Sequence, residues 1–221
     1  MYRIGAHPPS DMTTHHKPTA PGLSGEGAMT PMIEDTTDFP TSAFQNTDST
    51  DADIDCTVCF SGHREIPERE REALAARLEA ALIRLVEGGY NRFFAGGAIG
   101  FDTMAAEAVL RLRVRYPQIR LHLALPCHGQ EKRWSEDNRR TYDRIRDAAD
   151  FVVYTSPLGY THGCMQQRDR YLVDQSSVCL CYLTHLTGGT AYTVSYARRR
   201  GLSVINLAAD PAGEEEQLKL F

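Results

Sequence analysis

The sequence predicts an α/β fold in which a mainly parallel, six-stranded sheet is doubly wound, with helices on both faces. Two observations carry this prediction. Short apolar runs alternate regularly along the chain with segments of helical periodicity, and the apolar runs contain few polar residues, so both faces of each strand are buried. Helical segments between such strands act as right-handed crossovers of a parallel sheet. The expected domain is therefore Rossmann-like.

The individual elements follow from this pattern in order. The strands are predicted over residues 56–61, 92–95, 119–125, 151–154, 178–183 and 203–207. The helices are predicted over residues 68–87, 101–112, 135–147, 165–175 and 190–200. The first of these helices has a leucine face and ends at Gly88-Gly89, and the second ends before Pro117, as helix stop signals require. In such a sheet, ligands bind beyond the carboxyl ends of the strands.

Composition divides the chain into three parts. Residues 1–54 are rich in Thr, Pro, Ser, Gly and Asp and lack periodicity, so we expect a disordered acidic tail. Residues 55–208 form the predicted domain, and residues 209–221 form a C-terminal tail. Of the net charge of −5, residues 1–55 carry −7, which leaves the remainder nearly neutral at +2. Such a balance argues against nucleic acid as a direct ligand, which needs a basic surface.

Several protein classes and sites are not expected. No apolar run approaches the ~18 residues of a membrane span, and no basic start precedes an apolar stretch, so we expect a cytoplasmic protein without a membrane partner. Cys56 and Cys59 have zinc-knuckle spacing, but no second pair follows and both fall at a predicted buried strand. We therefore expect no metal site, no disulfide framework and no required cofactor.

Glycine-rich segments follow three of the predicted strands. They are Ser61-Gly62-His63-Arg64, the run from Gly96 through Gly97 and Gly100 to Asp102, and Gly188-Gly189-Thr190. Each leads into a helix, where free backbone N–H groups and the helix dipole favour an anion. For one glycine pair a structural turn is the simpler interpretation, whereas three at one edge favour an anionic ligand. Neither the P-loop nor the GxGxxG spacing is present.

Charged and aromatic side chains accompany these loops. Arg64 and His63 suit phosphate, although a plain surface arginine is the alternative for Arg64. Asp169 shares a helix face with apolar residues, so we expect its carboxylate to point inward and to meet Arg64, Arg168 or a ligand hydroxyl. Asp102 and Glu107 are further carboxylates, with helix capping and solvation as their alternatives. Trp134 and Tyr160 are candidates for stacking on a base or for ordinary packing.

These motifs together resemble the YpsA-like family of the SLOG superfamily, which is named for the DNA-processing protein DprA and the Lonely Guy enzymes. The resemblance covers roughly residues 56–208 and also includes the Leu125-Pro126 to Trp134 loop and the helix from Gln167 to Asp174. It implies a Rossmann-like domain that binds a nucleotide or nucleotide-derived ligand. The residues that inherit this binding role are Ser61, Gly62, His63, Arg64, Gly96, Gly97, Gly100, Asp102, Arg168, Asp169, Gly188, Gly189 and Thr190.

The resemblance leaves catalysis open. Lonely Guy enzymes hydrolyse the N-glycosidic bond of nucleoside monophosphates with a Pro-Gly-Gly-x-Gly-Thr-x-x-Glu motif, and the run from Leu186 to Val194 lacks both that proline and that glutamate. Asp102, Glu107 and Asp169 are the candidate substitutes, since a carboxylate stabilises an oxocarbenium ion. We therefore favour ligand binding or sensing, with a nucleotide N-glycosidase as the first alternative and a DprA-like DNA-binding protein as the second. A homo-oligomer is compatible with all three.

The chain ends in a separate motif. Gln217, Leu218, Leu220 and Phe221 resemble the peptide that bacterial replication and repair proteins insert into the DNA polymerase sliding clamp. A terminal Leu-Phe pair fills an apolar cleft while glutamine supplies a polar anchor. The alternative is a short helix that docks on its own domain. The resemblance implies a link to bacterial or phage DNA metabolism.

Overall fold

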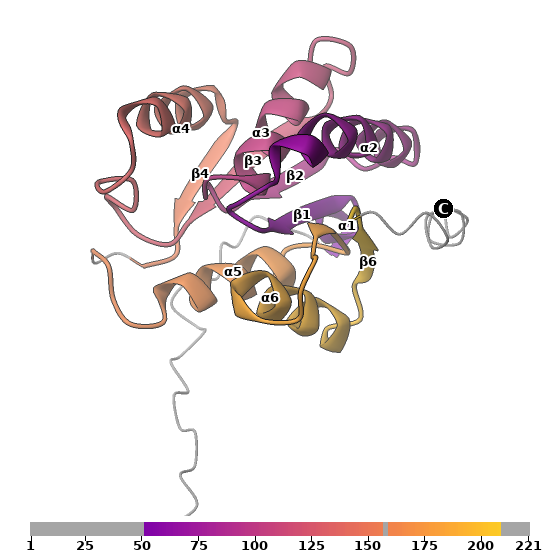
Figure 1. Ribbon diagram of the computed structural model, residues 1–221. Coiled ribbons are helices and arrows are strands. Elements are labelled where there is room, and N and C mark those ends of the chain that lie inside the picture. Colours follow the sequence, from indigo (N-terminus) through magenta and orange to yellow (C-terminus); the bar gives the residue numbers. More distant parts are fainter. Residues whose placement is uncertain (1–50, 157–158, 209–221) are drawn as a thin grey trace, which may run out of the picture. The chain divides into compact units, whose positions relative to one another are not determined.

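A computed structural model describes residues 51–156 and 159–208 (Figure 1). The strands are β1 (Thr57–Gly62), β2 (Arg92–Ala95), β3 (Arg120–Leu125), β4 (Phe151–Tyr154), β5 (Val178–Tyr182) and β6 (Ser203–Asn206). The helices are α1 (Asp51–Asp55), α2 (Glu68–Glu87), α3 (Phe101–Leu112), α4 (Glu136–Ala148), α5 (Cys164–Asp174) and α6 (Gly188–Arg199). Every predicted strand and helix is confirmed, with ends that differ by no more than two residues.

Helix α1 is the element that the sequence pattern did not predict. It falls inside the segment 1–54 that was expected to be disordered, so that expectation is wrong for residues 51–54. Contacts with distant residues explain its order: Asp53 forms an ion pair with Arg92 at 2.9 Å, and Ser177 Oγ donates a hydrogen bond to the Asp55 carbonyl at 2.9 Å. The rest of the predicted N-terminal tail and the C-terminal tail from residue 209 lie outside the described residues.

The strands form one sheet in the order β4-β3-β2-β1-β5-β6, and all neighbours are parallel. From β1 the chain adds β2, β3 and β4 on one side, and then returns to add β5 and β6 on the other. The strand order therefore reverses between β1 and β5. This is the point at which doubly wound sheets bind their ligands, beyond the carboxyl ends of the strands.

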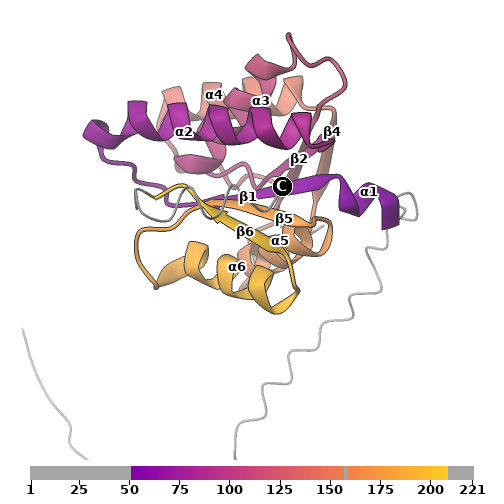
Figure 2. The same cartoon turned by 90° about the vertical axis from the view of Figure 1, so that its right-hand side faces the viewer.

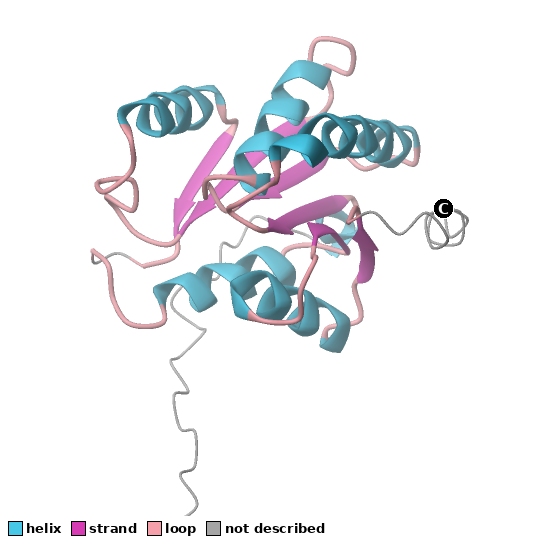
Figure 3. Cartoon of the chain, viewed as in Figure 1, coloured by secondary structure: helices cyan, strands magenta, loops and turns pink. Residues whose placement is uncertain are grey.

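The sheet lies between two layers of helices, as Figure 2 and Figure 3 show. Helices α2, α3 and α4 pack on one face around Phe60, Phe93 and Leu123, all of which are fully buried. Helices α5 and α6 pack on the other face around Leu172, Cys179 and Val194. Strands with apolar residues on both faces explain why the runs in the sequence do not alternate.

None of the described helices combines the length and the apolar character that a membrane crossing would require.

Candidate functional site

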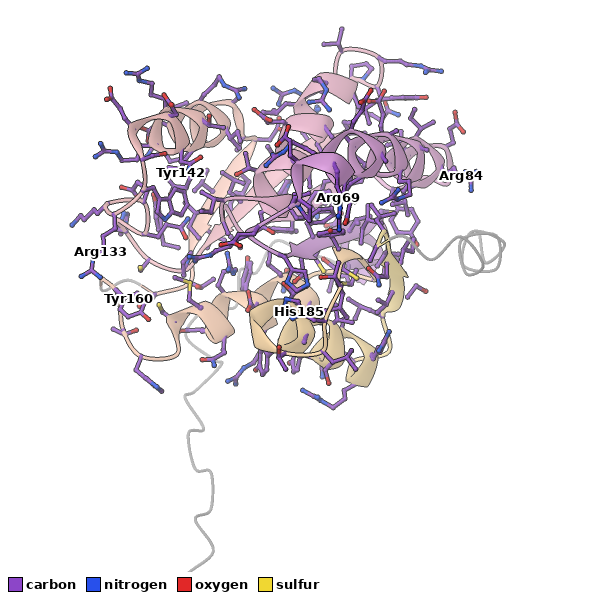
Figure 4. The ribbon with its side chains drawn as sticks, in the orientation of Figure 1. Arg69, Arg84, Arg133, Tyr142, Tyr160 and His185 are labelled. Atoms are coloured by element: carbon purple, nitrogen blue, oxygen red, sulfur yellow. The ribbon has the colours of Figure 1, made fainter. Side chains whose placement is uncertain are left out.

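The loops after β1 and β5 meet at the point where the strand order reverses. The backbone N–H of Thr184 donates a hydrogen bond to His63 Nε2 at 3.0 Å, and the rings of His63 and His185 stack with centroids 4.0 Å apart. Figure 4 labels His185 on the loop that leads into α6. Because Nε2 accepts this bond, the neutral His63 carries its proton on Nδ1. Burial, followed by the charge of His185, lowers the pKa of His63.

The loop after β1 packs directly against the start of α3. A Cβ atom at Gly62 would overlap the Phe101 side chain, and one at Gly100, whose φ is +88°, would overlap the Arg64 backbone. The Phe101 N–H also donates to the His63 carbonyl at 3.1 Å. These two glycines therefore permit a close approach between parts of the protein itself. The Arg64 side chain is exposed on this loop.

The loop after β2 is closed by side chains from other elements. A Cβ atom at Gly96 would overlap the Arg168 guanidinium and would lie 2.7 Å from Asp102 Oδ2. Gly97 has a φ of +65°, and its carbonyl accepts a hydrogen bond from Gln130 Nε2 at 3.2 Å. Small residues are thus needed here because α5 and the loop after β3 come close to the backbone.

A buried charged cluster lies beside this loop. Arg168 Nε donates to Asp169 Oδ1 at 2.7 Å, and Arg168 Nη1 donates to the Gly96 carbonyl. Asp102, Arg168 and Asp169 are only 5%, 8% and 9% exposed. Of the three partners expected for Asp169, the structure places Arg168 against it. Burial raises the pKa of Asp102 to about 6, although Arg168 and the N–H of Ala98 act to lower it.

Glu107 does not join this cluster. Its carboxylate forms an ion pair with Arg144 of α4, in a partly exposed position between α3 and α4. Of the three candidate catalytic carboxylates, the structure therefore brings Asp102 and Asp169 together beside Arg168 and leaves Glu107 in a surface ion pair.

The amino end of α6 differs from the other glycine-rich segments because it is open. A Cβ atom at Gly188 or Gly189 would have no heavy atom within 4 Å, and the N-cap residue Thr187 makes no side-chain capping bond. Gly188 has a φ of +85°, a left-handed conformation that glycine adopts without strain. The first N–H groups of a helix have no partner within the helix, so they remain available here.

Two largely buried residues with hydroxyl groups lie near this helix end. Ser61 ends the buried part of β1 on the face that Cys59 shares with α5 and α6, and Thr190 is in the first turn of α6. Each residue is 8% exposed, and no hydrogen bond of either hydroxyl is found among the described residues, where no fully buried side-chain oxygen lacks a partner, so both hydroxyls keep contact with solvent. Hydroxyls that are accessible and have no partner within the protein can bond to a polar ligand, so these two mark a position that suits one.

The two candidate stacking residues have different environments. Trp134 packs edge-on against Tyr142 at a centroid distance of 5.5 Å and is partly buried, as ordinary packing predicts. Tyr160, labelled in Figure 4 on the loop before α5, is 74% exposed. Of these two rings, that of Tyr160 is the more accessible to a ligand.

Sequence reasoning missed His185 and Thr184, which join the loops after β1 and β5. A single histidine in a polar loop gives no signal, because its partner His63 is distant in the chain. Within residues 51–156 and 159–208 no group of three or more His, Cys, Asp or Glu side chains could hold a metal ion. Cys59 is fully buried and Cys56 is half-buried, and all six cysteines are free thiols.

Comparison with known proteins gives a family and a fold. The model of the YspA SLOG family (YpsA) matches residues 65–202. A UPF0398 protein of Halalkalibacterium halodurans is 31% identical over 124 residues, which cover 55% of this chain and 66% of that protein. A UPF0398 protein of Bacillus pumilus is 27% identical over 165 residues, 66% of this chain and 86% of that protein.

Two solved structures share the fold. DNA processing protein A (DprA) from Streptococcus pneumoniae superposes with a TM-score of 0.53 at 16% identity, over 74% of this chain and 54% of that protein. DprA from Helicobacter pylori, described with a single-stranded DNA binding mode, superposes with a TM-score of 0.50 at 18% identity, over 74% and 72% of the two chains. This chain thus spans about half of the first protein, and the likeness is one of fold.

Proposed function

The chain belongs to the YspA SLOG family, and from that premise we propose that its domain binds or senses a phosphorylated, nucleotide-like ligand at the β1–β5 switch point. The observation that carries this proposal is the pair of accessible hydroxyls, on the largely buried residues Ser61 and Thr190, beside the open amino end of α6. Each can donate a hydrogen bond, and the helix end supplies N–H donors and a favourable dipole for an anion.

The phosphate end of the ligand is the part that α6 would hold. A Cβ atom at Gly188 or Gly189 would meet open space, and the first N–H groups of the helix have no partner within it, whereas the guanidinium of Arg168 is already engaged by Asp169 and Gly96. Arg64, exposed at the same rim, supplies a further cation. In this proposal the anion is bound mainly by backbone N–H groups and hydroxyl groups. Arg168 contributes indirectly, through its bonds to Asp169 and to the Gly96 carbonyl.

The remainder of a nucleotide fits the other groups of this rim. The carboxylates of Asp102 and Asp169 are acceptors of the kind that recognise ribose hydroxyls. The exposed ring of Tyr160 can stack on a base. A sugar phosphate without a base would use the amino end of α6 and the two carboxylates but not the ring of Tyr160. Tyr160 is therefore the residue whose contribution to affinity distinguishes a nucleotide from a sugar phosphate.

A titration of the full chain tests the binding proposal. Isothermal calorimetry with a panel of nucleoside monophosphates and dinucleotides should detect binding, and the double variant S61A/T190A should weaken the best ligand at least tenfold. Ser195→Ala removes an exposed hydroxyl from the far half of the same helix and should leave affinity unchanged. Equal affinity of wild type and S61A/T190A, or no binding by any nucleotide, would refute the proposal.

A nucleotide N-glycosidase is the second candidate, and the state of Asp102 favours it. A buried carboxyl group with a pKa of about 6 remains partly protonated near neutral pH and can act as a general acid. Against this candidate, α6 lacks the glutamate of the Lonely Guy motif. Release of free base from a nucleoside monophosphate, abolished in Asp102→Asn, would favour the enzyme over the sensor. DprA-like DNA binding has less support, because the domain is nearly neutral and the likeness to DprA is one of fold.

A docking function of the C-terminal peptide is independent of the pocket. Gln217, Leu218, Leu220 and Phe221 lie outside the described residues, so this proposal rests on their sequence alone. We expect a bacterial sliding clamp to capture the full chain, and capture to be lost in the double variant L220A/F221A. Lys219→Ala changes the residue between the two anchors and should not affect capture. Capture that survives L220A/F221A would remove the proposed link to DNA metabolism.

A further inference from the structure

Five of the six cysteines fall into two groups. Cys59, Cys179 and Cys181 lie on β1 and β5 in the middle of the sheet and are fully buried there. Cys127 and Cys164 lie at the carboxyl edge of the sheet, in the loop after β3 and at the first residue of α5. The second pair is far apart in the sequence, so any contact between its members depends on the fold.

The thiols of Cys127 and Cys164 contact each other. Burial raises the pKa of Cys127 above its ordinary value, and the charge of Cys164 and a hydrogen bond between the two side chains raise it further. The two residues are 0% and 1% exposed, so bulk water does not separate them. A hydrogen bond between two thiols places their sulfur atoms close to the arrangement of a disulfide, in which they lie about 2 Å apart.

The two segments that carry these cysteines also hold the loop after β2 between them. Helix α5 reaches that loop through Arg168, which donates a hydrogen bond to the Gly96 carbonyl. The loop after β3 reaches it through Gln130 Nε2, which donates to the Gly97 carbonyl at 3.2 Å. The thiol contact joins the two segments directly to each other. A covalent bond at this contact would therefore fix both walls around the loop after β2.

The cover over Cys127 is provided by a loop. Residues 126–135, between β3 and α4, contain neither helix nor strand. Two charged side chains of this loop, Glu131 and Lys132, act on the Cys127 thiol, and Lys132 is exposed. Segments without a ladder of backbone hydrogen bonds open locally at a lower free-energy cost than the strands of a core. A small, uncharged oxidant can therefore reach this pair more readily than the cysteines within the sheet.

We propose that Cys127 and Cys164 form a redox-modification site, which hydrogen peroxide converts into a reversible disulfide. The thiolate of one cysteine attacks a peroxide oxygen, the O–O bond breaks, and a sulfenic acid forms while the released hydroxide takes up the thiol proton. The second thiol then attacks the sulfenic sulfur, so that the S–S bond forms and the S–O bond breaks. The two thiols lose two electrons and two protons, and the peroxide becomes two molecules of water. None of these steps requires a bound nucleotide.

Mass spectrometry of the full chain tests the proposed pairing. The protein is reduced, separated from the reductant, treated with a stoichiometric amount of hydrogen peroxide and alkylated before a non-reducing tryptic digestion. We expect the peptides 121–132 and 147–168, each of which contains a single cysteine, to be linked and to separate with dithiothreitol. Free thiols at both positions, or a link from either one to another cysteine or to a second copy of the chain, would overturn the proposal.

Cys56 supplies the control, because it is the cysteine that is only half-buried. If accessibility alone directed the oxidation, Cys56 would react first and the other five thiols would remain free. We expect Cys56→Ser to form the link between 121–132 and 147–168 in the same yield as the wild type, and Cys164→Ser to lose it. Oxidation confined to Cys56 in the wild type, or loss of the link in Cys56→Ser, would contradict the proposal.

Thermal unfolding distinguishes a disulfide that suits the fold from one that forms only in a distorted chain. A bridge between residues already in contact constrains the unfolded chain, so the oxidised wild type should melt several degrees above the reduced protein. The same treatment should not raise the melting temperature of Cys164→Ser. A linked protein that melts below the reduced form would show that the bridge distorts the fold, and the assignment of a native redox site would fail.

Discussion

Arg168 and Asp169 are adjacent in the chain and also bonded to each other inside the protein, with 2.7 Å between Arg168 Nε and Asp169 Oδ1. Successive residues of a helix seldom face one another. Here both side chains turn toward the loop after β2, where Asp102 supplies a second carboxylate and the Gly96 carbonyl a further acceptor. The Arg168 guanidinium thus balances two buried carboxylates and bonds to the carbonyl that follows β2. It therefore connects α5 and α3 with the loop after β2.

Loss of the Arg168 side chain should therefore destabilise the domain strongly. Arg168→Ala leaves two carboxylates buried without their cation, which costs about 3–5 kcal/mol for a broken buried pair. Arg170→Ala, on the exposed side of the same helix, removes a bond to the Tyr192 hydroxyl and should cost less than about 1 kcal/mol. Urea unfolding followed by circular dichroism compares the two. Similar midpoints for both variants would show that the cluster is not structural.

The fold could be predicted because each element has a local signature. Apolar runs define the strands, and a periodic stripe or a glycine stop defines each long helix. Helix α1 has no such signature, since Arg92 and Ser177 order it from distant parts of the chain. Local patterns therefore identify the elements that carry the core and miss those that depend on tertiary contacts.

The candidate site could be predicted only in outline. The sequence placed the glycine-rich segments at the carboxyl edge of the sheet, and the structure places them there. The sequence could not distinguish glycines against which another part of the protein packs from glycines that face open space. Gly96 is covered by Arg168, 72 residues away, whereas a methyl group added at Gly189 would have no neighbour within 4 Å. That distinction depends on three-dimensional packing and has no local sequence signal.

This contrast between glycines gives the second prediction. Gly62→Ala would force a methyl group into the Phe101 side chain, and overpacking of this kind costs about 1–3 kcal/mol. Gly189→Ala meets open space and replaces glycine in a helix, so stability should stay equal or rise by up to about 1 kcal/mol. Thermal unfolding of both variants is the measurement. A larger loss of stability in Gly189→Ala than in Gly62→Ala would be inconsistent with this packing.

The third prediction concerns the pH dependence of stability through Asp102. Its pKa is about 6 in the folded protein and 3.8 in the reference state, so the folded state binds the proton more tightly. The contribution of this proton to the free energy of unfolding is fully present below pH 3.8 and is lost as the pH rises to about 6. The loss is on the order of 3 kcal/mol, at 1.36 kcal/mol per pKa unit.

Asp102→Asn removes this titration, so a comparison of the variant with the wild type measures it. The unfolding free energy of the variant minus that of the wild type should rise between pH 4 and pH 7, because only the wild type loses stability there. Denaturant unfolding at several pH values measures the difference, and contributions from other groups cancel in it. Glu107→Gln is the control, since its carboxylate lies in a partly exposed ion pair. A difference that does not vary with pH would mean that Asp102 titrates normally.

The fourth prediction concerns the contact between the loops after β1 and β5. His63 Nε2 can accept the Thr184 N–H only when the ring is neutral, and a protonated His63 would also repel His185. The pKa of His63 is lowered in the folded protein, so the contact is favoured above the ordinary histidine range and weakened as the pH falls through it. Tyr182, in edge contact with the His63 ring, is neutral at these pH values, because burial raises its own pKa to about 12.

Exchange of the Thr184 amide measures this contact directly. At neutral pH the amide should be protected in the wild type, and His63→Ala should remove that protection without affecting amides of the β5 interior. In the wild type, protection corrected for intrinsic exchange should decline as the pH falls toward 5, whereas His63→Ala should show no such decline. His162→Ala, an exposed histidine on the loop before α5, is the matched control. If the His63 and His162 variants protect Thr184 equally, the loops are held together by other contacts, and the amino end of α6 is positioned without the histidine pair.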